Sequence, residues 1–122
     1  MEKTILDSKD LMKKMIVCKF GGTSVASAEQ IKKVANIVKA NPKRRIVTVS
    51  APGKRFGDDI KVTDLLIDLA ESALQNDQVE ERLQNVLNRY IEIAQGLGLD
   101  GKICEVIEKD LRERITLKLE KE

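Results

Sequence analysis

The sequence predicts an α/β fold built around a short parallel sheet. An apolar run at 15–20 leads into a helical pattern at 28–40, and a second run rich in β-branched residues follows at 45–50. A strand, helix, strand succession of this length forms a right-handed crossover between parallel strands. Charged residues make up 34% of the 122 residues and nearly cancel to a net charge of +2, a composition that fits a globular domain. We therefore expect a small sheet accompanied by amphipathic helices.

The first half of the chain carries clear boundary signals. The strand at 15–20 is continuously apolar at its start, as expected of a parallel strand covered on both faces. The helix at 28–40 has apolar residues at intervals of three and four. Ser27 begins a capping box at its start. Asn41 and Pro42 end it, because the residue before a proline disfavours the helical region.

The second half of the chain is predicted to be helical after a loop rich in Pro, Gly and charge at 51–62. The helices are expected at 63–75, 78–95 and 101–115. Thr63 and Asp64 have the character of an N-cap for the first helix, and Asp77 with Glu80 has capping-box spacing before the second. We expect these helices to pack on one face of the sheet and to leave its other face and an edge open.

A glycine pair follows the first strand and is the best candidate for a phosphate site. Glycines 21 and 22 allow a backbone to approach an anion closely, because they carry no Cβ. The turn and helix start supply unpaired N–H donors, and Lys19 adds a charge at a strand end, where ligands of open α/β sheets bind. Thr23 and Ser24 are suited either to phosphate contact or to plain capping. The lysine precedes the glycines, unlike in a Walker A loop.

The segment 19–25, Lys-Phe-Gly-Gly-Thr-Ser-Val, resembles the N-terminal signature of aspartate kinases, members of the amino-acid kinase family. The stretches 49–55 and 62–66 agree with the same family. The resemblance implies a partial three-layer amino-acid kinase fold. It also implies that Ser50 and Thr63 line the pocket for the amino acid.

The implied reaction is ATP-dependent phosphorylation of the side-chain carboxylate of L-aspartate, the first step toward the aspartate-family amino acids, including lysine. Lys19 is the implied catalytic residue, and ATP would lie against Lys19, Gly21, Gly22, Thr23 and Ser24. Mg²⁺ is the implied cofactor, with its ligands outside this chain. The family's later acidic, Asp and Lys residues have no matching positions here, so we expect the chain alone to be inactive.

The same resemblance divides the chain into two parts. Residues 15–122 correspond to the N-terminal portion of a catalytic domain, and residues 1–14 form an extension.

A sheet of about two strands leaves backbone groups and an apolar face open. We therefore expect a homo-oligomer, since most oligomers are symmetric assemblies of one chain.

Composition argues against several other classes of protein. The chain has no His, which removes Ser-His and Cys-His nucleophile pairs and His metal sites. Balanced charge and an aromatic content of 2% disfavour nucleic-acid binding. No run of about 18 apolar residues is present to span a membrane. Cys18 and Cys104 form neither a metal spacing nor a disulfide framework, and free thiols suit the cytoplasm.

Two other hypotheses remain open from the residues. The first alternative is a non-catalytic helical interaction module that keeps a relic of the glycine loop. The second is a kinase of another amino acid in the same family, such as one acting on glutamate or a carbamate. Ser50, Thr63 and the Ala-Pro-Gly sequence at 51–53 argue against the second of these. An ATP-dependent assay with aspartate and glutamate distinguishes all three.

Overall fold

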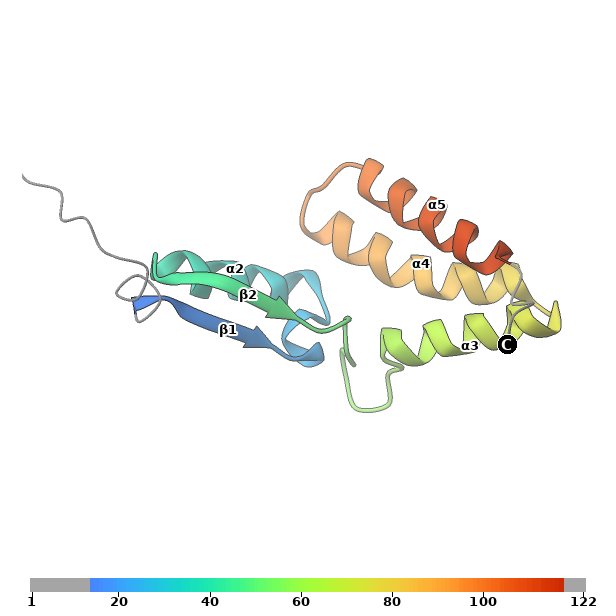
Figure 1. The fold of residues 1–122 in the computed structure, drawn as a ribbon, viewed down its shortest axis with the longest axis horizontal. Coiled ribbons are helices and arrows are strands. Elements are labelled where there is room, and N and C mark those ends of the chain that lie inside the picture. The colour runs from blue at the N-terminus through green and yellow to red at the C-terminus, as the bar shows by residue number, and fades with distance from the viewer. Residues whose placement is uncertain (1–13, 118–122) are drawn as a thin grey trace, which may run out of the picture.

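The computed structural model describes residues 14–117, which form a two-stranded parallel sheet, a crossover helix and a bundle of three further helices (Figure 1). In chain order the elements are β1 (Ile16–Phe20), the 3₁₀ helix η1 (Gly22–Val25), α2 (Ala28–Ala40), β2 (Arg44–Val49), α3 (Val62–Gln75), α4 (Val79–Gly96) and α5 (Lys102–Thr116). The predicted α/β class and parallel pairing are confirmed, and each predicted helix and strand begins and ends within one residue of its expected bounds. The proposed extension at 1–14 lies outside the described residues, apart from Lys14.

The sheet is small and only partly covered. Strand β1 pairs with β2 in parallel, with Val17 opposite Ile46 and Phe20 opposite Val49. Helix α2 crosses between the strands and packs against β2 (Figure 1). Its predicted cap is confirmed, because the Ser27 hydroxyl accepts a hydrogen bond from a backbone N–H of the first turn at 3.4 Å. Val17 and Ile46 share a face and are 64% and 47% exposed, so that face is open among the described residues.

The three C-terminal helices pack on one another beyond the carboxyl ends of the strands (Figure 1). Their core is formed by Leu69 of α3 and by Leu83, Val86 and Leu87 of α4, with apolar residues of α5 packed against it. The expectation that these helices lie on a face of the sheet is therefore wrong. The buried apolar residues of these helices pack against one another within the bundle, and only α4 has an extensive contact with α2. None of the helices in residues 14–117 is long and apolar enough to cross a lipid bilayer.

Two predicted N-caps are wrong, although the helices themselves start within one residue of their expected positions. Thr63 lies inside the first turn of α3, and the N-cap is Lys61, without a side-chain hydrogen bond. Helix α4 starts after Gln78, whose φ of 55° is left-handed. The backbone N–H of Asp77 instead donates to Ser72 O at 3.0 Å and closes the end of α3. The sequence around Asp77 is suited to an N-cap of α4. In the structure Asp77 instead follows the left-handed residue Asn76 and completes the C-terminal end of α3.

Candidate functional site

The candidate site lies where the two strands end and α3 begins. Three backbone hydrogen bonds join the segments there: Ser50 N–H to Phe20 O (3.1 Å), Gly53 N–H to Gly22 O (2.8 Å) and Val62 N–H to Pro52 O (2.9 Å). The loop after β1 is thereby tied to the loop after β2, and that loop is tied to the first turn of α3. The structure therefore brings together the three segments that carry the predicted phosphate and amino-acid residues.

The contact between the two loops is made by backbone against backbone at Gly22 and Gly53. A Cβ added to Gly53 would lie 2.6 Å from the carbonyl carbon of Gly22 and 2.9 Å from its oxygen. A Cβ added to Gly22 would lie 3.1 Å from Ala51 O. Gly21 differs, because a Cβ there would meet nothing within 4 Å and its φ of −72° suits any residue. Close packing of the two loops therefore explains why residue 22 is a glycine, but it does not explain the glycine at position 21.

Lys19 lies near the carboxyl end of β1, opposite Thr48 of β2, with an exposed side chain. Within residues 14–117 its ammonium group takes part in none of the ion pairs, which all use arginines. An exposed cation that is not neutralised by a described carboxylate is available to an anionic ligand. The position agrees with a phosphate role, and the role itself remains a prediction.

Thr23 and Ser24 lie in η1 rather than at the start of α2. Gly21 precedes that short helix without a side-chain cap, and Ser27 caps α2. The capping interpretation of Thr23 and Ser24 is therefore wrong. Thr23 is exposed and lines an open pocket of about 530 Å³, which also contains Lys54. Its hydroxyl is thus available to a ligand at the edge of the glycine loop.

Ser50 and Thr63 mark the two ends of the loop that joins β2 to α3. Ser50 directly follows the last residue of β2, and Thr63 is the second residue of α3. Both side chains are exposed. Because the loop folds back so that Val62 bonds to Pro52, both ends of the loop lie at the same end of the sheet. The arrangement is compatible with two hydroxyls that hold one small ligand.

Arg89 of α4 is a residue that the sequence reasoning missed. It is only 4% exposed, and its guanidinium group donates to three backbone carbonyls: Ile60 O (2.7 Å), Gly53 O (2.7 Å) and Ala26 O (3.2 Å). Burial lowers the pKa of Arg89 from its usual range, because the charged form loses hydration. A signal was present in the sequence, since Arg89 stands between Val86 and Ile93 on the apolar face of α4.

A cluster of charged side chains closes the loop between β2 and α3. The side chain of Arg55 donates two hydrogen bonds to Asp59, Nε to Oδ2 (2.7 Å) and Nη2 to Oδ1 (2.9 Å), and its backbone N–H donates a third to Oδ2 (2.9 Å). Nη1 of Arg55 also donates to Glu92 of α4 at 2.5 Å. These hydrogen bonds from Arg55 hold the pKa of Asp59 well below its usual range. Arg55 is therefore not a freely solvated loop residue, because Asp59 and Glu92 neutralise its charge. Lys54 is exposed.

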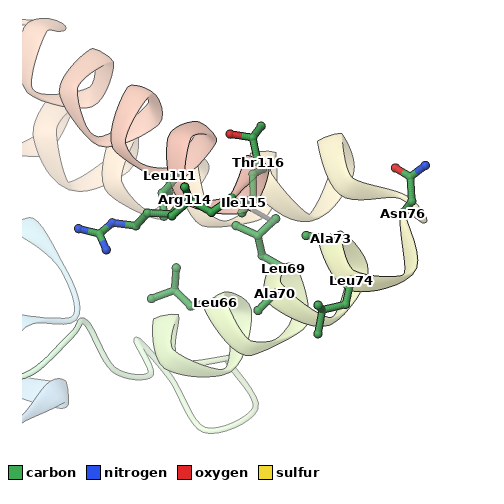
Figure 2. Close-up of a pocket in the computed structure, with 11 residues that line it drawn as sticks. Leu66, Leu69, Ala70, Ala73, Leu74, Asn76, Leu111, Arg114, Ile115 and Thr116 are labelled. Atoms are coloured by element: carbon green, nitrogen blue, oxygen red, sulfur yellow. The ribbon is translucent and has the colours of Figure 1, made fainter. Parts of the chain in front are cut away.

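A separate apolar pocket of about 870 Å³ lies between α3 and α5 (Figure 2). Figure 2 shows Leu66, Leu69 and Ala70 of α3 facing Leu111 and Ile115 of α5. The pocket contains none of the residues at the ends of the strands. It is a gap between helices of the bundle and is not part of the candidate site.

Residues 14–117 contain no group of three or more His, Cys, Asp or Glu side chains placed to hold a metal ion. Mg²⁺ is usually held by one or two carboxylates together with substrate phosphates, so the Mg²⁺ that the resemblance implies stays a prediction. The chemistry that this part of the chain can supply is that of a lysine, backbone amides and hydroxyl groups.

Comparison with known proteins gives matches along most of the chain. A profile of the amino acid kinase family matches residues 14–119. Aspartokinase 3 of Bacillus subtilis (strain 168) is 48% identical over 97 residues, which cover 80% of this chain and 21% of that protein. The lysine-sensitive aspartokinase 3 of Escherichia coli (strain K12) is 35% identical over 106 residues, which cover 87% of this chain and 22% of that protein. The chain thus spans about a fifth of the length of these relatives.

Solved structures agree with the sequence matches. The crystal structure of Clostridium acetobutylicum aspartate kinase is similar with a TM-score of 0.72 and 33% identity, covering 82% of this chain and 24% of that one. E. coli aspartokinase III in complex with aspartate and ADP, in its R-state, is similar with a TM-score of 0.64 and 32% identity, covering 81% of this chain and 20% of that one. These matches confirm the resemblance inferred from segments 19–25 and 49–55.

Proposed function

Because the chain belongs to the amino acid kinase family, we propose that it is part of the catalytic domain of an aspartate kinase. The reaction is transfer of the γ-phosphoryl group of ATP to the side-chain carboxylate of L-aspartate. The observation that carries the proposal is the hydrogen bond from Gly53 N–H to Gly22 O, because it joins the predicted phosphate loop to the predicted amino-acid loop. Similarity to an aspartokinase structure that holds aspartate and ADP supports the choice of substrates.

The proposed mechanism is positioning and charge stabilisation, without a covalent enzyme intermediate. Lys19 stabilises negative charge on the phosphoryl oxygens as the carboxylate of aspartate attacks. The remaining contacts to ATP come from the amides of Gly21 and Gly22 and the hydroxyls of Thr23 and Ser24, and those to aspartate come from Ser50 and Thr63. Mg²⁺, held by residues outside this chain, would neutralise phosphate charge.

We further propose that the protein works in the cytoplasm as a homo-oligomer. Cys18 and Cys104 are free thiols, which suit a reducing compartment. The exposed face around Val17 and Ile46 favours association with further protein. Since the chain spans about a fifth of its relatives, we propose that these 122 residues alone do not turn over ATP.

The experiment that tests the function is an ATP-dependent hydroxamate assay on the full-length gene product. We expect hydroxamate with L-aspartate and none above background with L-glutamate. Hydroxamate with glutamate alone would indicate another kinase of the family. No product with either amino acid, from a folded protein, would favour the non-catalytic interaction module.

Gly21→Ala separates a ligand-binding glycine from a structural one. The new methyl group meets no protein atom within 4 Å and the backbone angle is ordinary, so we expect an unchanged melting temperature. The same methyl group would stand between the backbone and a phosphate, so we expect kcat/KM for ATP to fall about tenfold or more, equivalent to about 1.4 kcal/mol. Gly101→Ala is the matched control, since a Cβ there also meets nothing. Wild-type kinetics for Gly21→Ala would remove Gly21 from the phosphate site.

A further inference from the structure

We propose that Arg89 is a positioning residue for the amino-acid side of the site, acting through the loop between β2 and α3. The proposal rests on the proposed function and assigns a task to a buried charge that the reaction itself does not use. Arg89 belongs to α4, which contributes none of the predicted substrate residues.

The surroundings of Arg89 are a poor arrangement for stability alone. A cation loses its hydration when it is buried, and only close pairing with an opposite charge compensates for that loss. The nearest carboxylate, that of Asp59, is 3.7 Å away and is already engaged by Arg55 at 2.7 Å. The direct partners of Arg89 are neutral carbonyl oxygens instead. The guanidinium group therefore joins three backbone segments through the carbonyls of Ala26, Gly53 and Ile60.

The carbonyls that Arg89 binds lie close to the candidate substrate residues in the chain. Gly53 comes three residues after Ser50, and Ile60 comes three residues before Thr63. Arg89 bonds to both carbonyls at 2.7 Å and so holds the two ends of one loop. Gly53 also donates to the glycine loop at Gly22. The distance between the two ends of the loop, which carry Ser50 and Thr63, is therefore determined in part by Arg89 of α4.

An arginine suits this task better than a lysine does. The guanidinium group is planar and carries five N–H donors in fixed directions, whereas an ammonium group is a single point. In the structure Nη1 of Arg89 bonds to Ile60, while Nη2 bonds to Gly53 and Ala26. Arg89→Lys would keep the charge and lose the span between the two ends of the loop.

The test compares Arg89→Lys with Arg82→Lys in the full-length protein. Arg82 lies on the same helix but pairs with Asp68 of α3 at 3.3 Å, so it is a matched control within the bundle. For Arg89→Lys we expect cooperative unfolding, faster deuterium uptake in residues 50–61, and a KM for aspartate raised about tenfold or more. We expect the KM for ATP to stay within about twofold, and Arg82→Lys to behave as the wild type.

The kinetic split distinguishes positioning from plain stabilisation. Loss of folded enzyme lowers the apparent kcat and leaves KM unchanged, because KM does not depend on the active fraction. A wild-type KM and wild-type uptake in Arg89→Lys would overturn the proposal. If Arg89→Lys does not fold, Arg89→Gln takes its place, and failure of both while Arg82→Lys folds would also overturn it. If the wild type has no aspartate-dependent activity, the proposed function fails, and deuterium uptake alone decides the role of Arg89.

Discussion

Lys19→Ala in the full-length protein should lower kcat by on the order of 10²–10³-fold, because removal of one charge-stabilising donor typically has an effect of this size. The KM for aspartate should change little, since Lys19 is proposed to act on the transferring phosphoryl group. Lys19 is exposed on β1 and forms no ion pair with the residues of 14–117. We therefore expect the free energy of unfolding to stay within about 0.5 kcal/mol.

Steady-state kinetics together with denaturant unfolding check this expectation. Lys33→Ala on the exposed side of α2 is the control, because it removes the same charge away from the strand ends. Lys19→Arg restores a charge but not the same geometry, so we expect kcat between those of Lys19→Ala and the wild type. An unchanged kcat for Lys19→Ala would leave Lys19 as an ordinary lysine at the end of a strand.

Gly53→Ala should both destabilise the protein and reduce its activity. The new Cβ would lie 2.6 Å from Gly22 C and 2.9 Å from Thr23 N, and these backbone atoms cannot swing aside as the end of a side chain can. Overpacking of this kind costs about 1–3 kcal/mol. Relief requires the two loops to separate, which would also lengthen the bond from Gly53 N–H to Gly22 O. We expect a lower denaturation midpoint and a kcat/KM for aspartate reduced by more than the loss of folded protein explains.

Gly57→Ala supplies the control for that prediction, because it lies in the same loop and its added Cβ would meet nothing within 4 Å. We expect Gly57→Ala to keep wild-type stability and kinetics. Equal behaviour of the two variants would mean that the loops do not meet at Gly53 in the working protein.

The parts of the fold that the sequence predicted are those with local causes. The bounds of α2 follow from Ser27 and from Pro42, and those of β1 and β2 from short apolar and β-branched runs. The caps before α3 and α4 were not predictable in this way. Asn76 and Gln78 have left-handed backbone conformations, and the N–H of Asp77 between them donates to Ser72 O at the end of α3. Both residues are non-glycine, and a left-handed conformation is uncommon for such residues.

The candidate site shows the same division. The position of Lys19 and the closeness of the two loops follow from a parallel crossover, which places both strand ends at one edge. The role of Arg89 does not follow, because its three carbonyl partners are 29, 36 and 63 residues away in the chain. No local pattern encodes such a convergence. Only the mismatch of an arginine on an apolar helix face indicates that a buried partner exists.

The two loops can meet at Gly22 and Gly53 because neither residue has a Cβ. Protein engineering of this region must therefore keep both residues as glycine. Lys54, Phe56 and Asp58 follow Gly53 in the loop between β2 and α3 and are exposed, so a mutational library can vary them without changing either glycine. In a library that varies residue 53, every variant other than glycine carries a Cβ that would clash with the backbone of Gly22. A library that keeps both glycines fixed and randomises the exposed positions of the loop therefore preserves the backbone contact between the two loops.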